Sequence, residues 1–144
     1  MTNSLITDIL LENERSRSSD IYLRQPRDGV WHEFSWGKVM SQARQVATFL
    51  QEKGLKPGDK VSIFSKNCAE WFITDFGITL AGMVNVPLFG NQPTDSIEYV
   101  LEHAEVGLVF VGKLDDPKTT STYIPESMPT VSLGYHPDIT TTHT

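Results

Sequence analysis

The side chains that could do chemistry are few, and their spacing matches no catalytic or metal-binding motif. The single cysteine, Cys68, has no partner for an internal disulfide. The four histidines (His32, His103, His136 and His143) lack metal-ligand spacing with Cys68 or with the carboxylates. The phosphate loop G-x-x-x-x-G-K-S/T, a G-x-G-x-x-G after a strand and the nucleophile turn G-x-S-x-G are all missing from the sequence. The residues alone therefore indicate no supported nucleophile and no metal site.

Five residues near predicted helix ends have structural interpretations. Asn67 is interpreted as a helix N-cap, with ligand contact as the alternative. Glu70 lies in the first turn of that helix, where a carboxylate favours the helix dipole. Trp71 is interpreted as a core or interface residue rather than a substrate platform, and Cys68 as a buried small apolar residue. His103 lies near a helix C-terminus, where an imidazolium interacts well with the last carbonyls; a catalytic role is the alternative.

Two lysines have a different position, because they follow the last predicted strand. In open α/β sheets, ligands lie in the crevice beyond the carboxyl ends of the strands. Lys113 and Lys118 are therefore candidates for ligand contact. Exposed lysines are more often simply solvated, and we keep both interpretations.

Composition limits the class of protein. The 144 residues, of which 39% are hydrophobic, suffice for one domain or for part of a larger one. The formal charge of −6 argues against a surface for nucleic acid or anionic membranes. Asp8 and Glu12 interrupt the first apolar run, which predicts no signal peptide, and no apolar stretch reaches the ~18–20 residues of a membrane span. We expect a cytoplasmic protein, peripheral to a membrane at most.

Apolar periodicity and turn residues predict the elements. A short helix is expected over residues 4–12, followed by a polar loop at 15–20. Two strand-like runs at 21–23 and 30–34 flank a turn at 26–29, which predicts a hairpin. The remaining elements, in order, are a helix capped by Ser35 and ended by Gly54, a strand at 60–65, a helix from Ala69 to about Gly82, a strand at 84–88, a helix capped by Thr94 or Asp95, a strand at 106–111 and a strand-like run at 130–133.

The fold class that follows is α/β, with a mostly parallel sheet flanked by helices and a small N-terminal β-hairpin. Apolar runs without alternation suit strands that are covered on both faces. Three regions are expected: an N-terminal helix and loop at 1–19, an α/β subdomain at 20–112, and a Thr/Pro-rich, partly ordered stretch at 113–144.

Several segments, in order, resemble the adenylate-forming (AMP-binding) enzymes. Residues 34–39, FSWGKV, are similar to the first core motif of the family, and residues 80–88, LAGMVNVPL, to the second. Residues 55–61, LKPGDKV, resemble the family's strand entry. Residues 67–71, NCAEW, and 99–105, YVLEHAE, are most similar to the long-chain fatty acyl-CoA synthetases. The resemblance covers about residues 20–115 and implies the N-terminal subdomain of such an enzyme.

The resemblance implies a two-step ligase in which a fatty acid attacks ATP, with Mg²⁺ present, and CoA then displaces AMP. The Ser/Thr/Gly-rich loop that holds the triphosphate would lie beyond the matched stretch. Residues 119–122 contain no Gly, and residues 140–144 contain neither Gly nor Lys, so neither is that loop. The matched segments are scaffold motifs, so no catalytic, cofactor-binding or metal-binding residue is carried over to this chain.

Three hypotheses remain open. The first is the N-terminal fragment of a long-chain fatty acid–CoA ligase, an inactive scaffold by itself, whose partner is the rest of the parent enzyme; ATP, Mg²⁺, CoA and fatty acid bind only in that context. The second is a non-catalytic binding or dimerisation module that self-associates through an exposed sheet edge. The third is a flavodoxin-like nucleotide-binding protein, although residues 65–67 and 90–92 are poor in glycine.

Overall fold

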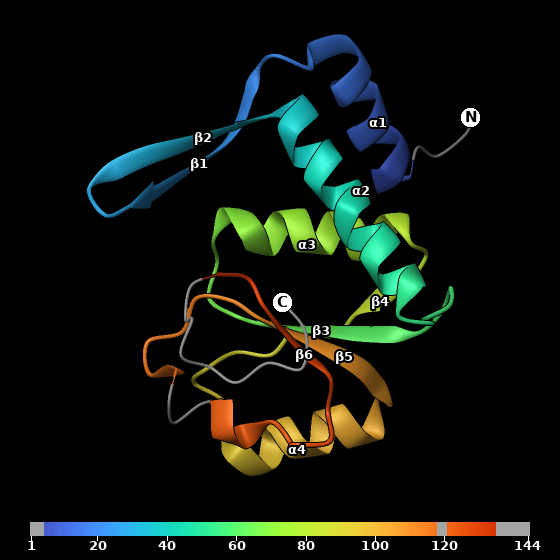
Figure 1. Cartoon of the computed structure of the whole chain (residues 1–144), viewed down its shortest axis with the longest axis vertical. Coiled ribbons are helices and arrows are strands. Elements are labelled where there is room, and N and C mark those ends of the chain that lie inside the picture. The colour runs from blue at the N-terminus through green and yellow to red at the C-terminus, as the bar shows by residue number, and fades with distance from the viewer. Residues whose placement is uncertain (1–4, 118–120, 135–144) are drawn as a thin grey trace.

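A central parallel sheet and a separate hairpin organise the chain (Figure 1). The computed structural model describes residues 5–117 and 121–134. In chain order the elements are α1 (Ile6–Arg17), β1 (Ile21–Arg27), β2 (Val30–Ser35), α2 (Trp36–Glu52), β3 (Lys60–Phe64), α3 (Ala69–Leu80), β4 (Val84–Asn85), α4 (Thr94–His103), β5 (Val106–Val111), the 3₁₀ turn η1 (Ser121–Tyr123) and β6 (Thr130–Ser132).

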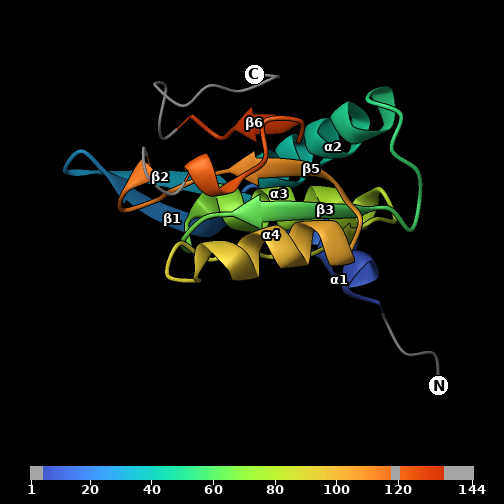
Figure 2. The same ribbon diagram turned by 90° about the horizontal axis from the view of Figure 1, so that it is seen from below.

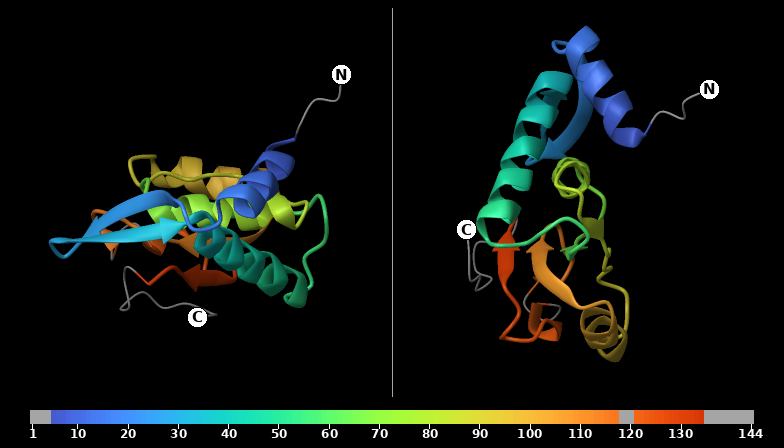
Figure 3. Two further views of the ribbon diagram at one scale, coloured as in Figure 1. Left: turned by 90° about the horizontal axis from the view of Figure 1, so that it is seen from above. Right: turned by 90° about the vertical axis from the view of Figure 1, so that its right-hand side faces the viewer.

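The sheet has the strand order β4-β3-β5-β6, and every neighbouring pair is parallel. Helices α2 and α3 cover one face and α4 covers the other (Figures 1 and 3). The hairpin of β1 and β2 is antiparallel and extends past the end of these layers (Figure 2). The predicted class, a mostly parallel α/β sheet flanked by helices with an N-terminal hairpin, is confirmed.

Strand β5 shows why both faces must be covered. Leu108 and Phe110 belong to the core beneath α2 and α3, whereas Val109 and Val111 belong to the core beneath α4. Successive side chains of a strand point to opposite faces, so an unbroken apolar run supplies both cores at once. Each of these four residues is at most 2% exposed.

The two residues predicted to begin and end α2, Ser35 and Gly54, have the expected roles. The Ser35 hydroxyl accepts a hydrogen bond from the Lys38 N–H at 3.1 Å, as an N-cap should. Beyond the helix end, Gly54 has φ +88°, a left-handed conformation that glycine adopts without steric cost. The apolar stripe of this helix is buried against α1, α3 and the sheet.

Two predictions for the N-terminal region are wrong in extent. Helix α1 continues to Arg17, three residues into the stretch predicted as a loop, and its Glu14 forms an ion pair with Arg44 of α2 that apolar periodicity does not reveal. The hairpin turn is narrower than predicted, since Pro26 is paired with Trp31 inside the ladder. Only Asp28 and Gly29 form the turn, with φ values of 52° and 76°.

Two further boundaries differ around the fourth strand and the fourth helix. Strand β4 ends at Asn85 instead of reaching Leu88, and beyond it a single bridge joins Phe64 and Leu88. The Val86 and Leu88 N–H groups still donate to the Val61 and Ile63 carbonyls of β3, and Pro87, which has no N–H to donate, lies between these two donors. The N-cap of α4 is Pro93, without a side-chain cap, and Thr94 is already helical. The strand predicted near residue 130 is confirmed as β6.

Helices α2 and α3 are packed tightly against each other at Gly77. A Cβ added there would lie 2.5 Å from Val46 Cβ and 2.7 Å from the Ala43 carbonyl oxygen. We expect Gly77→Ala to lower the free energy of unfolding by about 1–3 kcal/mol, because overpacking outweighs the better helix propensity of alanine. Urea denaturation measures this, with Gly90→Ala as control, since its added Cβ meets only Leu114 Cδ2 at 3.6 Å. An unchanged midpoint for Gly77→Ala would contradict close packing here.

The ion pair between α1 and α2 predicts a pH dependence. The hydrogen bond from Arg44 lowers the pKa of Glu14 below its usual value. The stabilisation is therefore present above the unfolded pKa of about 4.3 and is lost as the pH falls through the lowered folded value. Because Arg44 is half exposed, we expect Glu14→Gln to cost less than about 1 kcal/mol at pH 7, and progressively less as the pH falls below the unfolded pKa of Glu14. Thermal unfolding across this range is the measurement, and Glu12→Gln, within an exposed pair of one helix, is the control.

Candidate functional site

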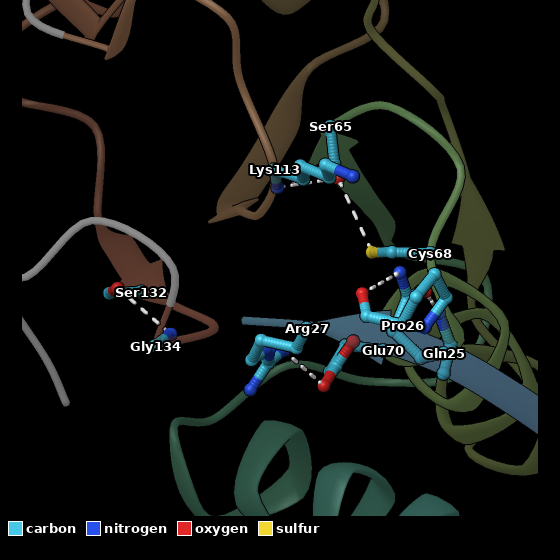
Figure 4. Close-up of polar contacts among 10 residues, drawn as sticks. Gln25, Pro26, Arg27, Ser65, Cys68, Glu70, Lys113, Ser132 and Gly134 are labelled. Carbon is cyan, nitrogen blue, oxygen red and sulfur yellow. Dashed lines mark hydrogen bonds and ion pairs between the residues drawn. The ribbon is translucent and has the colours of Figure 1, made fainter. Parts of the chain in front are cut away.

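The carboxyl edge of the sheet gathers polar groups from two strands (Figure 4). Ser65 follows β3, and its fully buried hydroxyl accepts a hydrogen bond from the Lys113 N–H at 2.8 Å. The same hydroxyl donates to the Lys66 carbonyl at 2.7 Å, and the Lys66 N–H donates to the Lys113 carbonyl at 2.8 Å. These bonds fasten the end of β3 to the segment after β5. The Ser65 hydroxyl is therefore engaged in structure rather than poised as a nucleophile.

Gly112 allows this close contact between the strand ends. A Cβ at this position would lie 2.7 Å from Ser65 Cβ, closer than real side chains approach. The thiol of Cys68 is 3.8 Å from the Ser65 hydroxyl and only 4% exposed. The prediction that Cys68 is a buried small residue is confirmed.

Of the two lysines predicted for ligand contact, only Lys113 lies within the described residues. The side chain of Lys66 forms an exposed ion pair with Asp115 at 2.9 Å. Lys113 is half-buried and reaches this edge through its backbone bonds. Lys118 lies outside the described residues, so ligand contact by Lys113 or Lys118 stays a prediction.

The predicted cap of α3 is wrong, and the residue that replaces it comes from the hairpin. Asn67 is exposed, and the N-cap position belongs to Cys68, which makes no side-chain cap. Instead the buried side chain of Gln25 accepts a hydrogen bond from the Ala69 N–H at 2.9 Å through Oε1, and donates to the Pro26 carbonyl at 3.2 Å. Gln25 precedes Ala69 by 44 residues, so rules that look for a cap beside the helix miss it.

A second contact holds the hairpin at the same helix end. Arg27 of β1 donates to Glu70 at 2.7 Å, and both side chains are partly buried (Figure 4). Glu70 lies in the first turn of α3, as predicted for a residue that favours the dipole. Its pairing with Arg27 was not predicted. Together, Gln25 and Arg27 orient the hairpin relative to the sheet.

A shallow groove of about 320 Å³ lies between α2, α3 and the last two strands. Its apolar floor includes Phe110, Val131 and Leu133, and Glu70 and Gln42 contribute polar atoms. Chemically, such a groove can hold apolar groups. It brings no nucleophile next to a base.

Trp71 and His103 occupy the positions that the sequence predicts. Trp71 is half-buried, packs against the core beneath α2 and α3 and meets the edge of Phe72 at 5.4 Å between ring centroids, so its core role is confirmed. Its indole N–H has no hydrogen-bond partner within the described residues. His103, in the last turn of α4, stacks on exposed Tyr99 at 5.1 Å. The imidazole is exposed, and His103 precedes the start of β5 rather than following the carboxyl end of a strand.

The described part of the chain contains no group of three His, Cys, Asp or Glu side chains placed to hold a metal ion. None of its helices is long and apolar enough to cross a membrane.

Comparison with known sequences identifies the family. The profile of the AMP-binding enzymes matches residues 13–141. The chain belongs to the AMP-binding enzyme family. It is 30% identical over 105 residues to the long-chain-fatty-acid–CoA ligase FadD15 of Mycobacterium tuberculosis, and 30% identical over 82 residues to long chain acyl-CoA synthetase 1 of Arabidopsis thaliana. These matches cover 73% and 57% of this chain but only 18% and 12% of the relatives, so the chain spans less than a fifth of their length.

Solved structures share the fold of this AMP-binding family member. The fatty acid AMP ligase of Legionella pneumophila superposes with a TM-score of 0.74 at 16% identity, over 88% of this chain and 23% of that one. The N-terminal subdomain of NpsA from Klebsiella oxytoca gives 0.73 at 21% identity, over 91% of this chain and 31% of that one. The resemblance to adenylate-forming enzymes noted from the sequence is thereby confirmed.

The cap provided by Gln25 can be tested against the cap predicted from the sequence. We expect Gln25→Ala to lower the free energy of unfolding by about 1–2 kcal/mol, because the buried Ala69 N–H loses its acceptor. Asn67→Ala, the matched control, should change it by less than about 0.5 kcal/mol, since Asn67 is exposed. Chemical denaturation measures both. A larger loss of stability for Asn67→Ala than for Gln25→Ala would mean that Asn67, and not Gln25, caps α3.

Proposed function

We propose that this chain is the N-terminal part of a long-chain fatty acid–CoA ligase and acts as scaffold, without a catalytic residue of its own. The observation that carries the proposal is the match to long-chain ligases over less than a fifth of their length. In the proposal, residues 20–112 are the core of the N-terminal subdomain, preceded by residues 1–19 and followed by the Thr/Pro-rich stretch 113–144. The rest of the enzyme is the main partner.

The proposed reaction of the longer protein has two steps. The fatty-acid carboxylate attacks the α-phosphate of ATP and releases pyrophosphate, and the CoA thiol then displaces AMP from the acyl-adenylate. The described residues of this chain do not fit Mg²⁺ or a triphosphate, because they hold no acidic or histidine cluster and no glycine-rich phosphate loop. We therefore assign ATP, CoA, fatty acid and any metal to the longer protein and derive no step through this chain.

The state of the polar groups supports a scaffold role. The Ser65 hydroxyl is hydrogen-bonded within the strand ends, and Glu70 is paired with Arg27. Lys66 and Asp115, both exposed at this edge, form an ion pair with each other. A buried, single cysteine is consistent with the reducing cytoplasm as the location we propose.

A dimerisation module is the second candidate, favoured by the open edges of the sheet. Strands β4 and β6 are outermost and have no further neighbour among the described residues. Unpaired strand edges can pair with a second copy. Light scattering of the purified chain across a concentration series distinguishes the two candidates, since a scaffold fragment that stays monomeric contradicts dimerisation as its role.

The proposed function predicts the outcome of an ATP–pyrophosphate exchange assay with palmitate and Mg²⁺. We expect no exchange above background from the 144-residue chain, and clear exchange from a longer protein encoded by the same reading frame. Turnover by the short chain alone would contradict the scaffold role. An inactive but folded longer protein would contradict the assignment as a ligase.

A further inference from the structure

The loop between β3 and α3, residues 65–68, is bonded to two distant segments of the chain at once. At its start, the Ser65 hydroxyl accepts a hydrogen bond from the Lys113 N–H at 2.8 Å. Immediately after its end, the Ala69 N–H donates to the Gln25 side chain of the hairpin at 2.9 Å. The loop therefore connects the carboxyl edge of the sheet to the hairpin (Figure 4).

Contacts within the loop make it move as one piece. The Lys66 N–H donates to the Lys113 carbonyl at 2.8 Å, and the Ser65 hydroxyl lies 3.8 Å from the Cys68 thiol. Ser65 is 0% exposed and Cys68 is 4% exposed, so both are packed on all sides. A closely packed interior transmits displacements instead of absorbing them. A shift of Ser65 therefore displaces Cys68 and the first turn of α3 that follows it.

The hairpin depends on this turn of α3 for its position. Tyr22 and Leu23 pack into the core formed with α1, α2 and α3, close to the start of β1. Further along β1, Gln25 is bonded to α3 through its side chain, and Arg27 forms an ion pair with the helix at 2.7 Å. A two-stranded hairpin is marginally stable in water without such support. The first turn of α3 thus decides whether the outer part of the hairpin stays docked.

We propose that the loop of residues 65–68 joins the hairpin and the carboxyl edge of the sheet into one cooperative unit, whose parts open and close together. The inference goes beyond the proposed function and does not depend on it. Proteins open locally in such units at free energies below that of global unfolding. Any contact that fixes the segment at Lys113 then stabilises the docked hairpin, and a contact on the hairpin stabilises the strand ends by the same factor.

Native-state hydrogen exchange at rising denaturant concentration tests the unit in the unsubstituted 144-residue chain. The reporters are the amides of Lys113, Ala69 and His32, of which the last is paired with Gln25 in the hairpin ladder. We expect these three amides to share one opening free energy, lower than that of the Val109 amide in the sheet. Three separate opening free energies would overturn the inference, as would a shared value equal to that of Val109.

Two buried serines provide a matched pair of variants. Ser62 and Ser65 are both 0% exposed, but the Ser62 hydroxyl has no hydrogen-bond partner within the described residues. Ser65→Ala leaves the Lys113 N–H without its acceptor. We expect it to accelerate exchange of the His32 amide at least about tenfold relative to Val109, whereas Ser62→Ala should leave this ratio unchanged. Equal acceleration in the two variants would contradict the proposed unit.

A double variant tests the route from the loop to the hairpin. If Ser65 acts through the bond between Ala69 and Gln25, Ser65→Ala and Gln25→Ala together should accelerate His32 exchange by less than the product of their separate effects. An effect equal to that product would mean that the two sites act independently, and it would overturn the inference. Should Ser65→Ala fail to fold, the exchange of the unsubstituted chain decides the question by itself.

Discussion

The parallel sheet imposes the central constraint on this chain, because its strands are apolar on both faces. Phe64 and Val109 enter one core, while Ile63 and Phe110 enter the other, so neither face of the sheet can remain in water. Helices α2 and α3 cover one face and α4 covers the other. The close approach of α2 and α3 at Gly77 follows from this need to cover one face with two helices. The positions of the remaining elements depend on these layers.

Polar contacts, together with the apolar packing of Tyr22, Leu23 and Phe34, place the hairpin. Gln25 provides the acceptor that the N-terminus of α3 lacks, and Arg27 pairs with Glu70 one residue further along the helix. Buried polar groups are costly when unpaired, so these contacts fix one orientation of the hairpin. As a consequence, β2 remains exposed over most of its length. An exposed strand is thus held in place by specific polar interactions of its neighbour, β1.

Polar groups at the carboxyl edge of the strands are also used to hold the fold together. At the carboxyl edge of the strands, where α/β proteins bind ligands, Ser65 joins two strand ends and Gly112 allows their contact. Hydrogen bonds that hold a scaffold in place are not available to a substrate. Membership of the AMP-binding enzymes is established by the match over residues 13–141, and the chain covers only 18% of the length of the Mycobacterium tuberculosis relative.

The sequence by itself determined the elements whose signals are local. A parallel α/β fold is predicted by the apolar stripe of α2, its Ser35 cap and the unbroken apolar run of β5. The spacing of apolar residues indicates which face of each element is buried. Only the tertiary structure decided the cap of α3 and the length of α1. Gln25 and Arg44 act on groups 44 and 30 residues away, and such contacts depend on how the packed layers bring distant segments together.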